Sequence, residues 1–250
     1  MSKVKNQYKH SYKNRYKLAS EKTVRGKTYR ERYAAVIMML MTFKDWNAGL
    51  VLDFGCGDGF FISTYGAFFD KIVGLDLSFE SLRHIEKLGD SQFIQGDIEN
   101  LPLEDQSVQW GITIETLEHL EDMDRGLREI GRCLRLSGIM IVTVPSLLSP
   151  RNINVYGRGS YLRGLVKVIS AIPKGYMKYE WQDGSGYKYP HWDYTKWKFR
   201  DVVKKAGLRV LMARKMPVIL NSKEDSLIER IINRVTGNRL GECHIMAVGK

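Results

Sequence analysis

Cysteine is scarce in this sequence, and the chain has no long apolar run. The three cysteines, Cys56, Cys133 and Cys243, are scattered and form no C-x-x-C pair. This argues against a disulfide framework or a zinc knuckle and favours a reducing compartment. The longest apolar stretch, AAVIMMLM at residues 34–41, is too short to cross a bilayer. No apolar segment follows the N-terminal lysines, so we expect no secretory signal and a cytoplasmic protein.

Acidic residues are nearly missing from the first 32 residues. This segment holds eleven Lys or Arg residues against Glu21 and Glu31, which gives it a net charge of +9 out of the chain's formal +11. Tyrosines such as Tyr8, Tyr12 and Tyr16 are interleaved with the basic residues. The pattern is typical of a solvated basic leader, or of a segment that binds an anionic partner such as RNA or a membrane surface. We therefore separate a basic N-terminal extension, 1–32, from a folded domain, 33–250.

Strand-like and helix-like segments alternate from residue 50 onward. The strands expected are VLDFG, KIVGLDLS, a short one ending at Asp97, WGITIET and GIMIVTVPS, with helical segments between them. HWDYTKWKFRDVVKKAGLRV predicts a helix leading into a sixth strand, and CHIMAVGK a seventh. This alternation predicts an α/β fold: a doubly wound, mostly parallel seven-stranded Rossmann-like sheet.

Residues 146–190 interrupt the alternation. They are rich in Gly, Tyr, Arg and Lys and contain one amphipathic helical segment, YLRGLVKVISAI. Ligands of doubly wound sheets lie at the carboxyl ends of the strands. An insertion between the fifth and sixth strands is therefore predicted to cover the ligand as a lid.

The glycine-rich stretch VLDFGCGDGF lacks the third glycine of a G-x-G-x-x-G dinucleotide fingerprint. Phe60 occupies that position, and no Gly-Lys-Ser/Thr follows as in a Walker loop. What remains is a strand that ends in Asp53 and a thin loop containing Gly55 and Gly57, against which a ligand can lie. A carboxylate at this loop suits an ammonium group better than a phosphate chain. S-adenosylmethionine (SAM) has an amino-acid tail, a sulfonium cation and no phosphate, so it fits.

Carboxylates end three consecutive predicted strands, at Asp53, Asp76 and Asp97. Asp76 can accept hydrogen bonds from two ribose hydroxyls. Asp97 can accept from an adenine amino group, with Ile98 or Leu101 against the ring. A single Asp at a strand end is as often a turn or cap residue. Three of them in this order, beside a glycine loop, favour a ligand site.

These motifs together carry a family resemblance. VLDFGCGDG, GLDLS, GDIENLPL, TIETLEHL and LRLSGIMIVTVPS resemble the class I SAM-dependent methyltransferases, in particular the broad group around the ubiquinone-pathway enzymes. The resemblance covers residues 50–145 closely and 191–250 loosely, and it is more specific for the cofactor than for the acceptor. It implies contacts of Asp53, Gly55 and Gly57 with the methionine part of SAM. The cofactor-binding residues expected are Asp53, Gly55, Gly57, Asp76, Leu77, Asp97, Ile98 and Glu115.

The fourth strand runs into the sequence ETLEH. In a helical turn, Glu115, Glu118 and His119 share one face, and His191 supplies a distant fourth ligand for Mg²⁺, Mn²⁺ or Zn²⁺. Such a cation would lower the pKa of an acceptor hydroxyl. Ubiquinone-pathway O-methyltransferases, and enzymes that 2′-O-methylate small RNAs, use a metal at a similar motif. Metal-free relatives carry the same motif, with Glu115 at the cofactor.

Without a metal, His119 or His191 is the expected general base, because a neutral imidazole works near physiological pH. The aromatics of 146–190 and Trp192 are expected to enclose the acceptor. A SAM-dependent methyltransferase acting on a small-molecule or lipid-like acceptor, with O-methylation favoured, is the function the sequence predicts. The alternatives are an RNA methyltransferase of the 2′-O type, which residues 1–32 would help to hold, and a non-catalytic SAM-fold binding protein. The sequence gives no oligomeric state.

Overall fold

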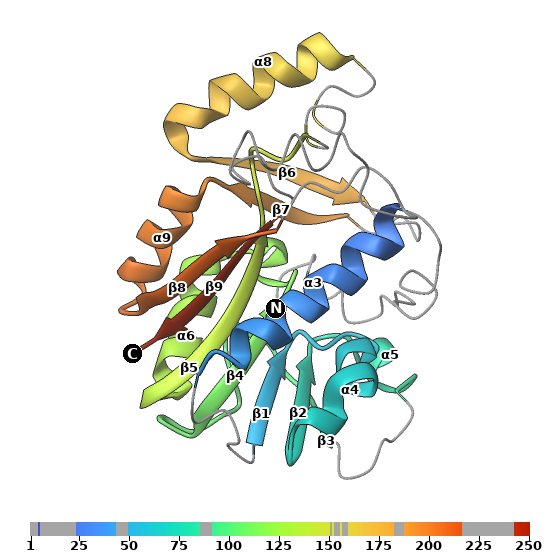
Figure 1. Ribbon diagram of the computed structural model, residues 1–250, viewed down its shortest axis with the longest axis vertical. Helices are drawn as coiled ribbons and strands as arrows, with labels where there is room; N and C mark the ends of the chain where they lie inside the picture. Colours follow the sequence, from blue (N-terminus) through green and yellow to red (C-terminus); the bar gives the residue numbers. More distant parts are fainter. Residues whose placement is uncertain are drawn as a thin grey trace.

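The computed structural model describes residue 5 and residues 24–43, 50–85, 92–150, 152, 156, 160–182, 188–216 and 243–250. Seven of the strands form one sheet in the order β3-β2-β1-β4-β5-β9-β8 (Figure 1). The strands of this sheet are β1 (Leu50–Phe54), β2 (Lys71–Asp76), β3 (Gln92–Gln95), β4 (Val108–Ile114), β5 (Leu134–Pro145), β8 (Arg209–Lys215) and β9 (Cys243–Gly249).

The sheet is parallel from β3 to β5, and β9 runs antiparallel to both of its neighbours. Strand order reverses between β1 and β4, so the carboxyl ends of these two strands flank the crevice where ligands of such sheets lie. The predicted doubly wound, mostly parallel seven-stranded sheet is confirmed.

Helices cover both faces of the sheet and divide the core in two. On one face, α3 (Val24–Leu40) and α4 (Phe60–Tyr65) bury apolar side chains such as Val36 and Ile62 against the strands. On the other, α6 (Met123–Cys133) and α9 (Lys196–Lys205) bury Leu127 and Phe199. Within the described part of the chain, no helix is both long and apolar enough to cross a membrane.

The helices begin where the sequence provides a polar cap. Asp122 accepts a hydrogen bond from the backbone N–H of Arg125 at the start of α6, as an N-cap residue does. The short helices are α5 (Phe79–Leu82) and the 3₁₀ turns η1 (Gly66–Phe68), η2 (Leu117–His119) and η3 (Ile172–Lys174). The helical segment predicted between the second and third strands is described only as the four residues of α5, and residues 86–91 lie outside the described residues.

The sequence predicts a helix that begins at His191, and this starting residue is wrong. Residues up to Tyr194 belong to strand β7 (Lys188–Tyr194), and α9 begins at Lys196 after the cap Thr195. Alternate aromatic residues such as Trp192 suit a strand, and pairing with a neighbouring strand overrides the helical pattern there. The predicted strand ending at Asp97 is also shorter, because β3 ends at Gln95.

The insertion after β5 forms a separate layer above the sheet (Figure 1). It contains α8 (Tyr161–Ala171), as the sequence predicts, followed by a hairpin of β6 (Tyr176–Gln182) and β7. An isolated bridge between Ser146 and Tyr194 ties β7 to the end of β5. The described part of 146–190 therefore lies near the carboxyl ends of the strands.

The helix α3 crosses residue 32, where we expected the boundary between the basic extension and the folded domain.

Candidate active site

An open pocket lies at the carboxyl ends of β1 to β4. Each of these strands contributes the segment that follows it, and Lys5 and Tyr189 complete the wall from elsewhere in the chain. The lining residues are Lys5, Gly55, Asp76, Leu77, Gly96, Asp97, Ile98, Glu99, Thr116, His119, Leu120, Glu121 and Tyr189. Of the predicted cofactor residues, the pocket therefore brings together Gly55, Asp76, Leu77, Asp97 and Ile98.

The glycine loop after β1 has a left-handed backbone. Gly55, Gly57 and Gly59 have φ angles of 82°, 59° and 72°, which side-chain-bearing residues rarely adopt. A Cβ atom on Gly55 would lie 2.2 Å from Cγ2 of Thr116. The N–H groups of Gly55 and Cys56 both donate to the carbonyl of Leu75, which holds the loop against β2. Gly55 therefore cannot carry a side chain, and the loop stays thin where it faces the pocket.

Asp76 fixes this loop to the end of β2. Its Oδ2 accepts a hydrogen bond of 2.8 Å from the Gly57 N–H, and its Oδ1 accepts one of 2.8 Å from the Ser78 N–H. Each carboxylate oxygen has a second lone pair, so Asp76 can accept further hydrogen bonds from a ligand in the pocket.

Asp97 and Glu99 form an acidic pair in the pocket wall, and Lys5 is bound to both carboxylates. The Lys5 ammonium lies 2.7 Å from Oδ2 of Asp97 and 2.9 Å from Oε2 of Glu99. Burial opposes the charge of Lys5, but the hydrogen bonds to the two carboxylates outweigh it and raise the pKa of Lys5. Oδ1 of Asp97 accepts from the backbone N–H of Glu99. Each oxygen of Asp97 thus already accepts one hydrogen bond, and the Lys5 ammonium stands at Oδ2.

Asp53 and Glu115 do not line this pocket. Asp53 is buried within β1. Glu115 has a φ of 52°, its Oε2 lies 3.1 Å from the buried guanidinium of Arg32, and its Oε1 accepts a hydrogen bond from Thr143. The contacts expected between these two carboxylates and the cofactor stay predictions.

Two histidines from distant parts of the chain meet at the other end of the pocket. The ring centroids of His119 and His191 are 4.9 Å apart, and His119 also meets Tyr189 edge-on at 4.7 Å. Nδ1 of His119 lies 3.3 Å from the carbonyl of Pro190. Because a carbonyl only accepts, this contact places the proton of a neutral His119 on Nδ1, and Nε2 is then the ring nitrogen with the lone pair.

The buried carboxyl group of Asp193 lies next to the His191 ring. Nε2 of His191 lies 3.3 Å from Oδ1 of Asp193, and the hydroxyl of Tyr156 donates to Oδ2 of Asp193. Asp193 is only 1% exposed. Its burial, and then the negative charge of Glu115, raise the pKa of Asp193 well above its usual value. The arrangement fixes the position of the His191 ring.

The sequence of the part of the sheet from β1 to β5 matches a known family. The sequence model described as "Methyltransferase domain" (Methyltransf_11) matches residues 52–142, from β1 to β5. The first relatives found are SAM-dependent methyltransferases by name. Residues 52–142 belong to a class I SAM-dependent methyltransferase domain.

Two curated relatives illustrate the match of the methyltransferase domain. A "Probable S-adenosylmethionine-dependent methyltransferase" of Mycobacterium tuberculosis is 29% identical over 100 residues, which are 40% of this chain and 36% of the relative. The malonyl-[acyl-carrier protein] O-methyltransferase of Hamiltonella defensa is 32% identical over 99 residues, 39% of this chain and 37% of the relative. The chain thus spans little more than a third of the length of these relatives.

The fold of the methyltransferase domain and its insertion is shared more widely. A Haloferax volcanii protein, solved in complex with the Trm112 methyltransferase activator, superposes with a TM-score of 0.59 at 18% identity. The superposition covers 93% of this chain and 95% of that one. At this identity the likeness shows the fold alone.

The E-x-x-E-H segment of the methyltransferase domain does not form the expected helical face. The helical turn is the three residues of η2, and Glu115 precedes it in a left-handed conformation. Glu118 is turned into the protein, 1% exposed, with Oε1 3.7 Å from Nε2 of His119. Among the residues described, no three His, Cys, Asp or Glu side chains are grouped to hold a metal ion.

The aromatic side chains of the insertion divide between the two faces of the β6–β7 hairpin. Tyr179 and Trp181 lie with His191 on the face toward His119. Their ring centroids are 4.8 Å and 5.8 Å, respectively, from the centroid of the His191 ring. Tyr176 and Trp192 lie on the other face, packed into the main core, so the expectation that they enclose the acceptor was wrong. Tyr161 is exposed on α8, and Tyr187 lies outside the described residues.

Sequence reasoning missed six of the residues that line the pocket: Lys5, Gly96, Glu99, Thr116, Leu120 and Glu121. Thr116 and Glu99 lie next to the predicted Glu115 and Ile98, so their position after a strand was a usable signal. Lys5 carried no such signal, because nothing local links the N-terminal segment to Asp97. Two further basic residues of this segment, Lys27 and Arg32, are buried, so they are not part of an exposed charged surface.

Proposed function

We propose that this chain transfers the methyl group of SAM to a hydroxyl group of a small-molecule or lipid-like acceptor. One observation carries the proposal. A single pocket joins Gly55, Asp76 and Asp97 to His119 and Tyr189, which lie at the aromatic face of the insertion. A donor bound along the strand ends and an acceptor bound under the hairpin would therefore meet beside His119.

The residues of the pocket fit SAM. Asp76 and Asp97 offer acceptor oxygens, Leu77 and Ile98 offer apolar contacts for a ring, and the glycine loop leaves room for the ligand backbone. Bound SAM would supply a methyl group made electrophilic by its sulfonium. The protein has to hold the acceptor oxygen in line with that methyl group and to exclude water.

His119 is the general base in this proposal. Its Nε2 would take the proton of the acceptor hydroxyl as the oxygen forms its bond to the methyl carbon, while the carbon–sulfur bond breaks and the electron pair stays on sulfur. Nδ1 remains bound to the carbonyl of Pro190, which keeps Nε2 in the accepting tautomer. His191, backed by Asp193, packs against the His119 ring and limits its rotation.

The acceptor is tested by transfer of tritiated methyl from SAM into a host cell extract. The extract is then divided into organic-soluble and nucleic-acid fractions. Label in the organic fraction supports the proposal, and the compound is identified by mass. Label in RNA would replace it with the 2′-O methyltransferase alternative. Absence of transfer, with SAM binding intact, would favour a non-catalytic binding protein.

The general base is tested with His119→Gln. We expect kcat to fall about 10²- to 10⁴-fold with little change in the Kd for SAM. His84→Gln is the matched control, because His84 is exposed and outside the pocket. Unchanged turnover by His119→Gln would remove His119 from the mechanism.

The divalent cation stays a prediction. Glu115 is bound to Arg32 and Glu118 is buried, so these side chains do not fit a cation site and no step is derived through a metal. Addition of EDTA to the transfer assay tests it: full activity contradicts the sequence hypothesis, and loss that Mn²⁺ or Zn²⁺ restores supports it. The cytoplasmic location is likewise our proposal, based on the scarcity of cysteine and the lack of a C-x-x-C pair in the sequence.

A further inference from the structure

The helix α8 exposes an apolar stripe. Leu162, Val166 and Ile169 are 71%, 58% and 56% exposed, and they follow one another at spacings of four and three residues, so they lie on one side of the helix. Tyr161 and Ile172 extend the stripe at both ends. We use "α8 stripe" for these five residues. Other exposed large apolar residues, such as Leu136 and Leu211, are scattered over separate strands.

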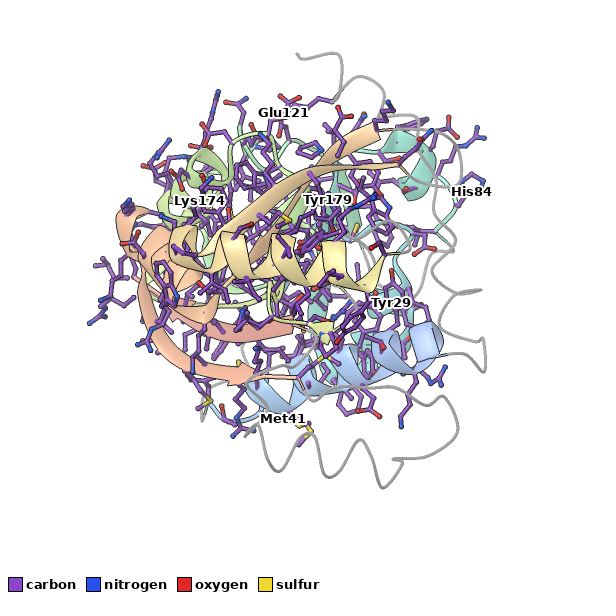
Figure 2. The ribbon with its side chains drawn as sticks, turned by 90° about the horizontal axis from the view of Figure 1, so that it is seen from above. Tyr29, Met41, His84, Glu121, Lys174 and Tyr179 are labelled. Atoms are coloured by element: carbon purple, nitrogen blue, oxygen red, sulfur yellow. The ribbon has the colours of Figure 1, made fainter. Side chains whose placement is uncertain are left out.

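The opposite side of α8 already has its packing partners. Gly164, Val168 and Ala171 are buried, and the latter two pack with Leu147 and Tyr156 in a small core beneath the helix. The stripe is therefore not needed to attach α8 to the domain. Seen from above, α8 is the outermost element, in front of the β6–β7 hairpin (Figure 2).

Positive charge borders the stripe. Arg163, Lys167 and Lys174 follow each other at spacings of four and seven residues, on the side of the helix between the stripe and the buried face. Residues 160–178 contain no Asp or Glu. Lys174 marks the C-terminal end of this segment in Figure 2. An apolar band with a purely cationic margin is complementary to an anionic lipid surface.

Aromatic side chains stand at both ends of the helix. Tyr161 begins α8, and at the other end Trp197, also more than half exposed, has its ring beside Gly175. Tyr and Trp prefer the level of the lipid headgroups, because their rings are apolar and their tips are polar.

We propose that α8 is an interfacial membrane-binding helix, which lays the α8 stripe into the surface of an anionic bilayer. Below it, Tyr179 of β6 packs against both the small core and the ring of His191. Docking would thus bring the acceptor side of the pocket close to the bilayer. The docking itself is independent of the proposed methyl transfer, since it is measured as binding.

The test is co-sedimentation of the full chain with vesicles. One set is phosphatidylcholine alone, and the other is phosphatidylcholine mixed with phosphatidylglycerol. Two variants separate the contributions: Leu162→Ser/Val166→Ser/Ile169→Ser removes the apolar stripe, and Arg163→Gln/Lys167→Gln/Lys174→Gln removes the charge. The matched control Met38→Ser/Leu136→Ser/Leu211→Ser changes three exposed apolar residues elsewhere. Residues 1–32 are present throughout, so any binding by the basic segment is constant.

We expect the wild type to bind the anionic vesicles and the control variant to bind them equally well. The affinity of the stripe variant for these vesicles should be at least about tenfold lower. The charge variant should lose the preference for phosphatidylglycerol, and rising salt should weaken wild-type binding. Equal binding by wild type and stripe variant would overturn the proposal, as would equal binding of the wild type to both vesicle sets. Absence of vesicle binding would also overturn it. If the wild type is a dimer and the stripe variant a monomer, the α8 stripe binds a second copy of the chain instead of a bilayer.

Discussion

The guanidinium of Arg32 lies 3.1 Å from the carboxylate of Glu115, and this ion pair joins α3 to the end of β4. Both side chains are largely shielded from solvent, and the positive charge of Arg32 compensates a carboxylate held in a left-handed backbone conformation. The ion pair therefore holds α3 against the end of β4 without lining the pocket.

Loss of Arg32 should be costly for stability. Arg32→Met leaves the Glu115 carboxylate without its cation, and removal of one partner of a buried pair costs about 3 kcal/mol. The double variant Arg32→Met/Glu115→Gln should recover part of this loss, because no uncompensated charge remains. Urea unfolding of the single and double variants measures the coupling, and additive effects would contradict it.

Gly55 should tolerate no side chain. Gly55→Ala places a Cβ atom 2.2 Å from Thr116 in a backbone with φ of 82°, so the loop has to move and SAM binding should be lost. Gly207→Ala is the matched control, with φ of 79° and no atom within 4 Å of the added Cβ. It should cost about 1 kcal/mol of stability from backbone strain and leave the SAM affinity unchanged. Calorimetric titration of SAM, with thermal unfolding, checks both.

Lys5 should compete with SAM for Asp97. Lys5 lines the pocket and its ammonium is bound to Oδ2 of Asp97, so an adenine amino group that approaches this oxygen has to displace the lysine. Lys5→Ala should therefore lower the Kd for SAM about three- to tenfold. Lys71→Ala, an exposed lysine at the far end of β2, is the control. Weaker SAM binding by Lys5→Ala would show instead that the lysine belongs to the bound site.

Glu118 should make stability fall as the pH rises. Burial, and then the charge of Glu115, raise the pKa of Glu118 well above its usual value. Between its unfolded and folded pKa values, the folded state holds a proton that the unfolded chain has released. The free energy of unfolding therefore decreases as the pH rises through this window.

Glu118→Gln removes this dependence. Relative to the wild type, the variant should gain stability as the pH rises above the ordinary pKa of a glutamic acid, since the cost of ionising a buried carboxyl no longer arises. Glu104→Gln, at an exposed position, should show no such gain. Denaturant unfolding at several pH values measures the difference. A constant difference between variant and wild type across this range would contradict the assignment.

Local sequence determined the sheet and the donor half of the pocket. Alternating apolar patterns define strands and helices, and the parallel order then gathers the strand ends at one edge. For this reason Gly55, Asp76, Asp97 and Ile98 could be placed in one pocket from their spacing alone. The thin loop containing Gly55 and Gly57 was also predicted, and glycine permits the left-handed conformation that the loop adopts.

Tertiary structure decided the rest. His119 and His191 are 72 residues apart in sequence and meet because β7 folds back over η2, which no local pattern encodes. Glu115 turns away from the pocket because Arg32, 83 positions earlier, attracts its carboxylate. Likewise, the side of α8 that stays exposed depends on which face its neighbours bury. The sequence determines the elements through short-range periodicity, while long-range charge pairing and packing determine which side chains face one another.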